Sequence, residues 1–240
     1  MKLSARRIRA IITKELREYR RNRYIIIGMA ILPLVFTIQP LIAVLNLGAE
    51  AHGLLAHEHV LLYMLGIPAL VPCVVAASSV AGERAQATLE PALSTPIRRE
   101  EYLLGKALAA LIPSLVVAYC VFALFLVAVV LFAAPGIAAS LIQGPDLAAQ
   151  IVFTPLLAAW SIWVSIAMSC RSSDVRVAQQ LSTIASLPAA FAAILIAVGV
   201  VPPSLPLAIG AVMLLLALDV AGWRIVSRLF DRERLITGAA

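Results

Sequence analysis

The sequence predicts an all-α integral membrane protein with six transmembrane helices, and three observations carry that prediction. Hydrophobic residues make up 62% of the 240-residue chain and charged residues 13%, whereas soluble domains average about 45–50% and 25%. The mean hydropathy is +0.99, and several apolar runs are long enough to cross a bilayer core of about 30 Å. The basic residues are confined to alternate connections between those runs. Together these features exclude a compact soluble domain.

Six apolar runs have the length of a membrane span: residues 24–47, 60–82, 107–134, 147–169, 180–201 and 205–225. The third run is too long for one ordinary span, because the 36 residues from Ala107 to Ile142 carry no charge and would measure about 54 Å as a single helix. A tilted span that ends near Pro135-Gly136, followed by an outer interfacial stretch, fits this run.

The orientation follows from the positions of the 19 Lys and Arg residues. All of them lie in residues 1–23, in the second-to-third and fourth-to-fifth connections, or in the tail that begins at Arg224. The other connections hold none. Because Lys and Arg are enriched in cytoplasmic segments, both termini are predicted to be cytoplasmic, with 226–240 as the tail. The net charge of +6 is then a topology signal, and we expect no nucleic acid as a partner.

Residues 1–23 contain an amphipathic pattern. Apolar side chains recur on one helical face between residues 3 and 21, with Lys and Arg elsewhere: Leu3, Ile8, Ile11, Ile12, Leu16 and Tyr19. This predicts a basic helix in the headgroup plane with its apolar side in the lipid boundary. The alternative is a basic flank that only fixes the topology.

The connection 83–106 predicts two short helices with a stop between them. Thr88 can cap the first helix, and Pro91 is tolerated in its opening turn. Thr95-Pro96 forms an N-cap and first-position pair for the second. Glu100-Glu101 then falls in the early turns of that helix, where its dipole favours negative charge.

Four strings occur in order around this connection: Gly82-Glu83-Arg84, Thr88-Leu89-Glu90, Thr95-Pro96-Ile97 and Gly105-Lys106. With the six spans and the basic amphipathic N-terminus, they make the chain resemble the type-2 ABC exporter permeases, the transmembrane subunits of ABC-2-type transporters. The resemblance covers essentially the whole chain. It implies that the helix bearing Thr-Leu-Glu is a coupling helix that docks on a separate ATP-binding subunit. The residues implied in this coupling are Glu83, Arg84, Thr88, Leu89, Glu90, Pro91, Leu93, Thr95 and Pro96.

The resemblance also implies an assembly and a location. The chain would be a permease that pairs with itself or with a sister permease in a bacterial or archaeal inner membrane, and two ATP-binding subunits would hold the ATP and Mg. The second and fifth spans would face the partner permease and form the substrate route. Two departures stand out. Ala85-Gln86-Ala87 replaces the usual Glu-x-Gly, and only Val201-Pro202-Pro203-Ser204 separates the last two spans.

No enzyme is predicted in this chain. The phosphate-binding pattern G-x-x-x-x-G-K-[ST] is absent, because Ala107 follows Gly105-Lys106 and Glu100 stands where the first Gly belongs. No cofactor is expected in the chain itself. Paired acids of the kind that form proton relays are also missing from the spans. A pump built on this chain therefore needs its energy from a partner subunit.

Uncharged polar residues in the spans have two readings. Helix packing in lipid uses Ser and Thr, and the alternative is a lining of the translocation path. The candidates for that path are Ser78, Ser79, Ser182, Thr183 and Ser186. Asp219, the one acid well inside a span, is a functional candidate by default, although pairing with a basic residue or an interfacial position is favoured. Cys73, Cys120 and Cys170 are interpreted as packing residues.

The three histidines lie in one predicted outer loop. His52, His57 and His59 are weak candidates for a zinc or copper site, and the alternative is an ordinary solvated loop. They are the only support for a permease that moves a metal- or haem-related cargo. A non-pumping membrane scaffold or sensor is a further alternative. The substrate itself does not follow from the sequence.

Overall fold

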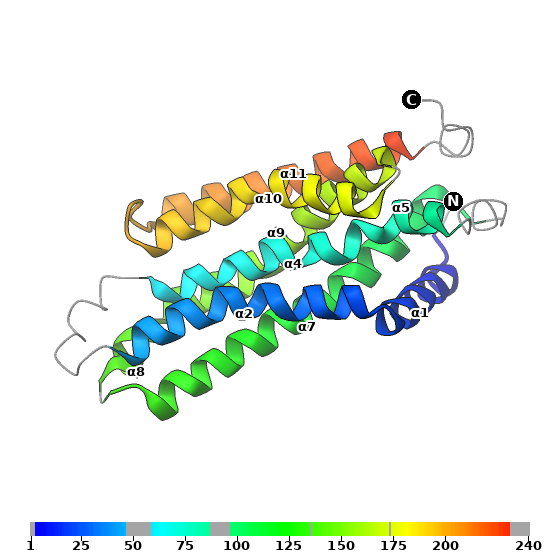
Figure 1. The fold of residues 1–240 in the computed structure, drawn as a ribbon. Helices are drawn as coiled ribbons and strands as arrows, with labels where there is room; N and C mark the ends of the chain where they lie inside the picture. Colours follow the sequence, from blue (N-terminus) through cyan, green and yellow to red (C-terminus); the bar gives the residue numbers. More distant parts are fainter. Residues whose placement is uncertain (1–2, 47–58, 87–96, 135, 173, 231–240) are drawn as a thin grey trace.

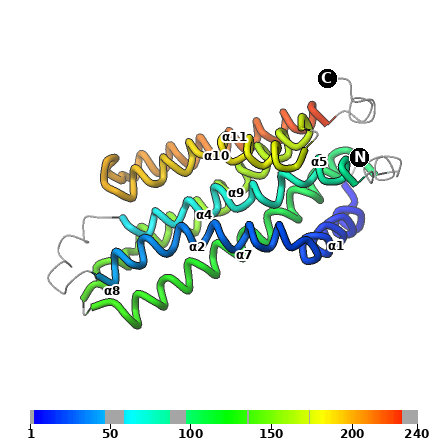
Figure 2. Tube along the Cα trace, viewed as in Figure 1, coloured from blue at the N-terminus to red at the C-terminus, as the bar shows by residue number. Residues whose placement is uncertain are grey.

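The computed structural model describes residues 3–46, 59–86, 97–134, 136–172 and 174–230. Within these ranges every regular element is a helix, and the long helices lie side by side in an elongated bundle (Figures 1 and 2). In chain order the elements are α1 (Ala5–Arg21), α2 (Arg23–Leu45), the 3₁₀ helix η2 (Val60–Leu65), α4 (Gly66–Ala76), α5 (Ser78–Ala85), α7 (Arg99–Phe132), α8 (Ile137–Leu141), α9 (Gly144–Arg171), α10 (Val175–Ala197) and α11 (Leu205–Leu229).

In the described part of the chain, six helical segments are long and apolar enough to cross a membrane, which confirms the predicted number. The first, third, fourth, fifth and sixth spans are α2, α7, α9, α10 and α11, and the second consists of η2, α4 and α5 in succession. The start of α1, the end of α5, the start of α7 and the end of α11 lie at one end of the bundle (Figure 1). We call this the basic end, and the end beside α8 the opposite end.

The structure corrects the prediction at the start of the third span. The second short helix expected in 83–106 is not separate, because α7 begins at Arg99 and continues to Phe132. Its N-cap is Arg98, whose backbone N–H donates to Glu101 Oε2 at 3.3 Å. Thr95-Pro96 therefore does not start this helix. The segment from Glu100 to Lys106 has no helix breaker except a single Gly, so the helix propagates into the apolar run.

The end of α7 at the opposite end of the bundle agrees with the prediction. The helix ends at Phe132, and the short α8 follows where the interfacial stretch was expected. Gly136 separates them with φ of 89°. This left-handed conformation carries no steric cost for glycine. Ile137 and Leu141 of α8 are buried in the hydrophobic core of the opposite end.

The second span is the centre of the bundle. In its most apolar stretch 89% of the residues are buried inside the protein, against 11% in the sixth span. Helices α2, α7, α9 and α10 all pack against α4. This differs from the implied arrangement in which the second span faces a partner permease, because its own chain already covers it. The exposed apolar faces belong to the peripheral spans, as expected of helices in contact with lipid.

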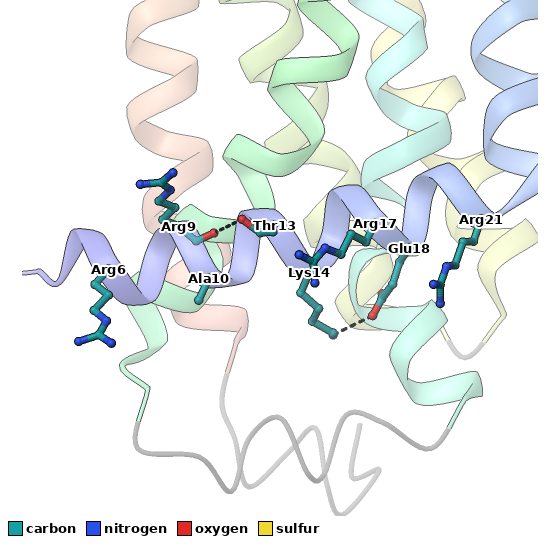
Figure 3. A pocket seen from close by; sticks show the side chains of 8 residues that line it. All are labelled: Arg6, Arg9, Ala10, Thr13, Lys14, Arg17, Glu18 and Arg21. Atoms are coloured by element: carbon teal, nitrogen blue, oxygen red, sulfur yellow. Dashed lines mark hydrogen bonds and ion pairs between the residues drawn. The ribbon is translucent and has the colours of Figure 1, made fainter.

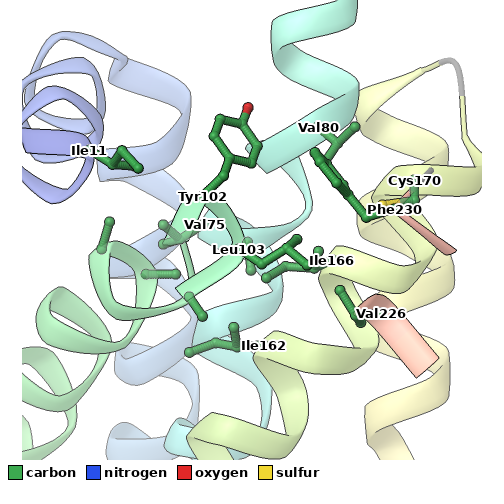
Figure 4. Packing of buried hydrophobic residues seen from close by; sticks show 14 of the residues in the cluster. Ile11, Val75, Val80, Tyr102, Leu103, Ile162, Ile166, Cys170, Val226 and Phe230 are labelled. Carbon is green, nitrogen blue, oxygen red and sulfur yellow. The ribbon is translucent and has the colours of Figure 1, made fainter. Parts of the chain in front are cut away.

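At the basic end, α1 lies crosswise beneath the ends of the spans (Figure 3). Its Ile11 belongs to the core cluster that contains Tyr102 and Leu103 of α7 and Ile166 of α9 (Figure 4). The side chains of Ile11 and Tyr19 are each 7% exposed. This corrects the expectation that the apolar face of α1 lies in the lipid boundary, since the periodicity identifies an apolar face but not what covers it.

Gly105 permits the close approach of α1 to α7. A Cβ atom at this position would lie 2.7 Å from Ile11 Cγ2 and 2.8 Å from Ile11 Cβ, which is well inside van der Waals contact. Any larger residue must therefore displace α1. The packing of α1 against α7 thus requires a glycine at this position of the Gly105-Lys106 string.

We expect Gly105→Leu to lower the stability of the folded protein, because the added side chain separates α1 from α7. Overpacking of this kind costs about 1–3 kcal/mol. The matched control is Gly210→Leu, another glycine within a helix, where an added Cβ meets nothing within 4 Å. Thermal unfolding in detergent measures the difference, and equal midpoints for the two variants would contradict the tight contact.

Candidate functional site

A buried group of charged side chains joins three helices at the basic end. Lys106 Nζ on α7 contacts Glu15 Oε1 on α1 at 2.8 Å and Glu83 Oε1 on α5 at 3.2 Å. Lys14 Nζ on α1 also contacts Glu83 Oε1, at 2.5 Å. The Tyr102 hydroxyl donates a hydrogen bond to Glu83 Oε2. We call Lys14, Glu15, Glu83, Tyr102 and Lys106 the charge cluster.

The charge cluster is balanced, with two ammonium groups against two carboxylates. Lys106 has a fully buried side chain, and those of Glu15 and Glu83 are 3% and 6% exposed. Lys14 is more open, and although burial opposes its charge, the hydrogen bond to Glu83 and the nearby carboxylates raise its pKa. It therefore stays an ammonium group at physiological pH. Buried charges that are mutually paired are stable only as a set, because removing one leaves another uncompensated.

Local helical spacing brings these groups together. On α7, Tyr102 and Lys106 are four residues apart and so share one face, with the Lys106 ammonium 5.0 Å from the centre of the Tyr102 ring. On α1, the Tyr19 hydroxyl donates to Glu15 Oε2 at 3.2 Å. Burial and the adjacent Glu15 carboxylate raise the pKa of Tyr19, so the phenol remains a donor.

A second set of contacts fixes the first turn of α1. The buried Glu101 accepts hydrogen bonds from the backbone N–H of Ser4 and from Arg7 Nη2, each at 2.8 Å. Arg7 Nε contacts the other Glu101 oxygen at 2.8 Å. The start of α7 is tied to α11 as well, because Arg99 Nη1 donates to Ser227 O at 3.1 Å. Helix α1 is thus held at two points along its length.

The charge cluster brackets the predicted coupling segment. Glu83 precedes that segment and Lys106 follows it, and the two side chains form an ion pair. Arg84, the other predicted residue in the structure, donates from Nη1 to Ser172 O at 3.2 Å and so links the end of α5 to the end of α9. The remaining predicted coupling residues lie outside the described part of the chain: Thr88, Leu89, Glu90, Pro91, Leu93, Thr95 and Pro96.

A serine of α9 interrupts the second span. Ser169 Oγ donates to Ala77 O at 2.7 Å and accepts from Ala81 N at 2.9 Å. These are the two backbone groups that would bond to each other in a continuous helix. It also accepts from Val80 N at 3.0 Å. An inserted hydroxyl of this kind breaks a helix, and α4 indeed ends at Ala76 and α5 begins at Ser78.

Four of the five predicted path residues use their hydroxyls in helix contacts, whereas Ser79 Oγ is buried with no hydrogen-bond partner among the residues that the structure describes. Ser182 and Ser186 are fully buried, and Ser79 is 2% exposed. The hydroxyls of Ser182 and Thr183 donate to carbonyls of their own helix, and that of Ser78 donates to Val75 O at the end of α4. Ser186 accepts from Cys73 Sγ at 3.4 Å. These contacts fit the packing interpretation. A path role for the five residues stays a prediction.

The structure also bears on two further candidates from the sequence, the histidines of the possible metal site and Asp219. His59 Nδ1 lies 2.7 Å from Asp146 Oδ1 at the opposite end, so this nitrogen is engaged within the protein, while His52 and His57 lie outside the described ranges. Asp219 Oδ1 is buried, and no hydrogen-bond partner is found for it among the residues that the structure describes. The favoured pairing of Asp219 with a basic residue is therefore not observed there.

The sequence analysis missed most of the charge cluster. It assigned no role to Lys14, Glu15 or Tyr102, and Lys106 entered only as part of a motif. A usable signal was present, because Glu15 lies on the apolar face of the amphipathic pattern, between Ile11 and Tyr19. A carboxylate on the apolar face of the helix becomes buried when that face is covered, and a buried carboxylate needs a cation beside it. The break made by Ser169 has no comparable signal in the second span itself.

Comparison with known proteins agrees with the resemblance. The model of a family described as ABC-2 family transporter protein matches residues 9–188, which is most of the chain. The matched region runs from α1 to α10 and includes the whole charge cluster and Ser169. No curated protein matches the chain.

Replacing Lys106 with Met should destabilise the protein strongly, because Glu15 and Glu83 would keep their burial and lose their shared cation. Breaking a buried pair in this way costs about 3–5 kcal/mol. Lys14→Met removes the same charge from a side chain that is 44% exposed, and it should cost far less. Thermal unfolding of both variants in detergent tests this order, and a reversal would show that the buried ammonium does not hold the cluster together.

Ser169→Ala should lower stability by about 1–3 kcal/mol, because a buried backbone group at the break loses its partner. Ser165→Ala is the matched control. Ser165 is equally buried on the same helix, but its hydroxyl donates to Ser161 O, one turn back, and does not bridge the backbone groups of the break. Thermal unfolding distinguishes the two. If both variants unfold at the same temperature, the inserted hydroxyl contributes nothing beyond an ordinary helix serine.

Proposed function

The chain belongs to the ABC-2 family of transporter proteins, and we propose that it is the membrane-spanning permease subunit of an ATP-driven exporter. Family membership establishes a transmembrane permease subunit that is not itself catalytic and that associates with an ATP-binding subunit. The proposal adds the direction of transport and the route of coupling. The single observation that carries the route is the charge cluster around Glu83 and Lys106.

The coupling argument begins with the two ends of residues 87–96. One end follows Glu83 on α5, and the other precedes Lys106 on α7. Because these side chains are paired and also contact Lys14 and Glu15 of α1, the flanks of the segment form one rigid support. A push on the segment is then passed to α1, α5 and α7 together rather than absorbed by a loose loop.

The break at Ala77 provides a position at which the second span can bend under that push. Helix α5 is joined to α4 through a position where the continuous backbone ladder is replaced by Ser169 contacts. A short helix attached through such a break can pivot while α4 keeps its packing, since hinges are a few residues that absorb the change in backbone angles. In our proposal, closure of two ATP-binding subunits pushes on the coupling segment and tilts α5. The second span then reorients and opens the bundle outward.

The proposal assigns ATP and Mg to the partner subunits and none of the chemistry of hydrolysis to this chain. It places the chain in a bacterial or archaeal inner membrane, with both termini in the cytoplasm and the basic end on that side. Two copies of the chain, or one copy and a sister permease, would form the membrane part of the exporter.

Co-purification of an ATP-binding subunit tests the docking site. Tagged wild-type protein from gently solubilised native membranes should retain that subunit, whereas Leu89→Arg and Glu90→Arg should lose it, since each places a new cation in the proposed coupling segment. Arg176→Gln, an exposed position at the start of α10, serves as a control that should still bind. Absence of any ATPase from the wild-type preparation would remove the energy source and with it the exporter proposal.

Glu83→Gln separates coupling from docking. The variant keeps the size of the side chain but loses the charge that Lys14 and Lys106 share, so the support behind the segment loosens. We expect the ATP-binding subunit to co-purify as with wild type. Stimulation of its ATPase activity by reconstitution with the permease should fall by about tenfold, equivalent to about 1.4 kcal/mol of lost coupling. Unchanged stimulation would show that force does not pass through the cluster.

A further inference from the structure

The first turns of α9 carry a stripe of buried polar residues. This helix begins beside α8 at the opposite end of the bundle (Figure 1). Asp146, Gln150 and Thr154 follow one another at intervals of four residues, so they lie on one face of the helix. Their exposed fractions are 3%, 1% and 0%. We call these three residues the polar stripe.

Apolar packing lines both sides of the polar stripe. Leu147 packs on the hydrophobic cluster that includes Leu61 of η2, and Phe153 packs on the cluster that includes Leu62 of η2. Because an α-helix turns once in 3.6 residues, Leu147 and Phe153 lie on opposite sides of the stripe. The polar groups are thus set into the contact between α9 and the start of the second span, with hydrophobic side chains on either flank.

His59 holds the first residue of the polar stripe. Its Nδ1 lies 2.7 Å from Asp146 Oδ1, and this nitrogen carries the hydrogen because an ionised carboxylate only accepts. His59 directly precedes η2, so the contact joins the start of the second span to the start of α9. It engages one of the two oxygens of the carboxylate and fixes the direction of the other.

Two buried oxygens of the polar stripe have no hydrogen-bond donor among the residues that the structure describes, Asp146 Oδ2 and Gln150 Oε1. Burial without a partner is unfavourable for any polar atom and most of all for a carboxylate oxygen, because these atoms have given up their water. Further along the same face of α9, the Ser161 hydroxyl donates to Ala69 O and is satisfied within the protein. The two oxygens therefore call for a small donor or a cation beside them.

The chemistry of the two oxygens favours a small monovalent cation. Carboxylate and amide oxygens are ligands of hard cations, whereas transition metals prefer nitrogen and sulfur. Among the described residues no three His, Cys, Asp or Glu side chains gather as such a site would need. One carboxylate beside a neutral amide balances a single positive charge, and a calcium site would draw on more oxygens than these.

We propose that Asp146 Oδ2 and Gln150 Oε1 are two ligands of a small monovalent cation such as Na⁺, with water completing its shell. Side chains four residues apart on a helix are neighbours, so both oxygens can reach one ion. His59 acts here as a positioning residue for the carboxylate and not as a ligand, which distinguishes this site from a zinc or copper site at the histidines. The inference depends neither on ATP coupling nor on the direction of transport.

Thermal unfolding of the full-length, detergent-solubilised protein tests the site, with NaCl exchanged for choline chloride at constant total salt. The unfolding midpoint of the wild type should rise with Na⁺ and then level off. The rise should reach about 3–6 °C once Na⁺ exceeds its dissociation constant about tenfold. Asp146→Asn keeps the shape of the side chain and an acceptor for His59 but loses the charge, so the rise should disappear.

Two further variants make the test specific. Gln150→Met keeps the length of the side chain and loses the amide oxygen, so about tenfold more Na⁺ should be needed for the same rise. This variant also decides the question if Asp146→Asn does not fold. The matched control is Ser161→Ala, a buried residue on the same face whose hydroxyl has a partner within the protein. It should lower the midpoint in both salts and leave the rise with Na⁺ unchanged.

Four results would overturn the proposal. An equal midpoint in NaCl and choline chloride would mean that a water molecule or another part of the chain satisfies the two oxygens. A rise that never levels off would indicate a general effect of the salt. A rise that persists in Asp146→Asn would place the bound cation elsewhere in the protein. An unchanged requirement for Na⁺ in Gln150→Met would show that the amide oxygen is not a ligand.

Discussion

The fully buried ammonium group of Lys106 is the interaction on which the basic end of this protein depends. It contacts both Glu15 and Glu83, and through them it joins α1, α5 and α7. A charge buried at this depth is tolerated only because its partners are equally buried and equally fixed. The cluster therefore acts as an all-or-none connection. Either the three helices are held in register by the whole set, or the remaining charges pull water into the core at this end.

The position of the cluster along the membrane axis is as informative as its composition. Charged groups are costly within hydrocarbon, and loose surface pairs contribute little. The boundary where a span meets water is the level at which ion pairs are both tolerated and strong enough to join helices. Glu83 stands at the last turn of the second span and Lys106 just inside the third. A connection from an aqueous partner to a membrane helix has to be built at this level.

Sequence reasoning recovered the features that depend on neighbouring residues and missed those that depend on distant ones. The number of spans and the stop near Gly136 follow from local hydropathy and chain stiffness, and both are present in the structure. The prediction from Thr95-Pro96 was wrong because residues that can cap a helix do not require a helix to begin there. The uninterrupted run after Arg99 determines where the helix lies. The break at Ala77 could not be predicted, since its cause, Ser169, lies 92 residues further along the chain. The same is true of Lys106 and Glu15, 91 residues apart.

Helix α1 has two unlike faces in two unlike environments, because its apolar face is packed on α7 and its arginines are exposed. The amphipathic pattern alone suggested one partner, the lipid, for the apolar face. Gly105 gives that face to α7 instead, and this leaves the arginine-rich face as the side that meets the surroundings. Packing on α7 and the ion pairs of the charge cluster join α1 to α7 and α5, so the helix against which α5 can tilt is α4, which α2, α7, α9 and α10 cover. In the proposed mechanism a push from a docked subunit therefore moves the joined helix ends together, and the second span bends where Ser169 interrupts its backbone hydrogen bonds.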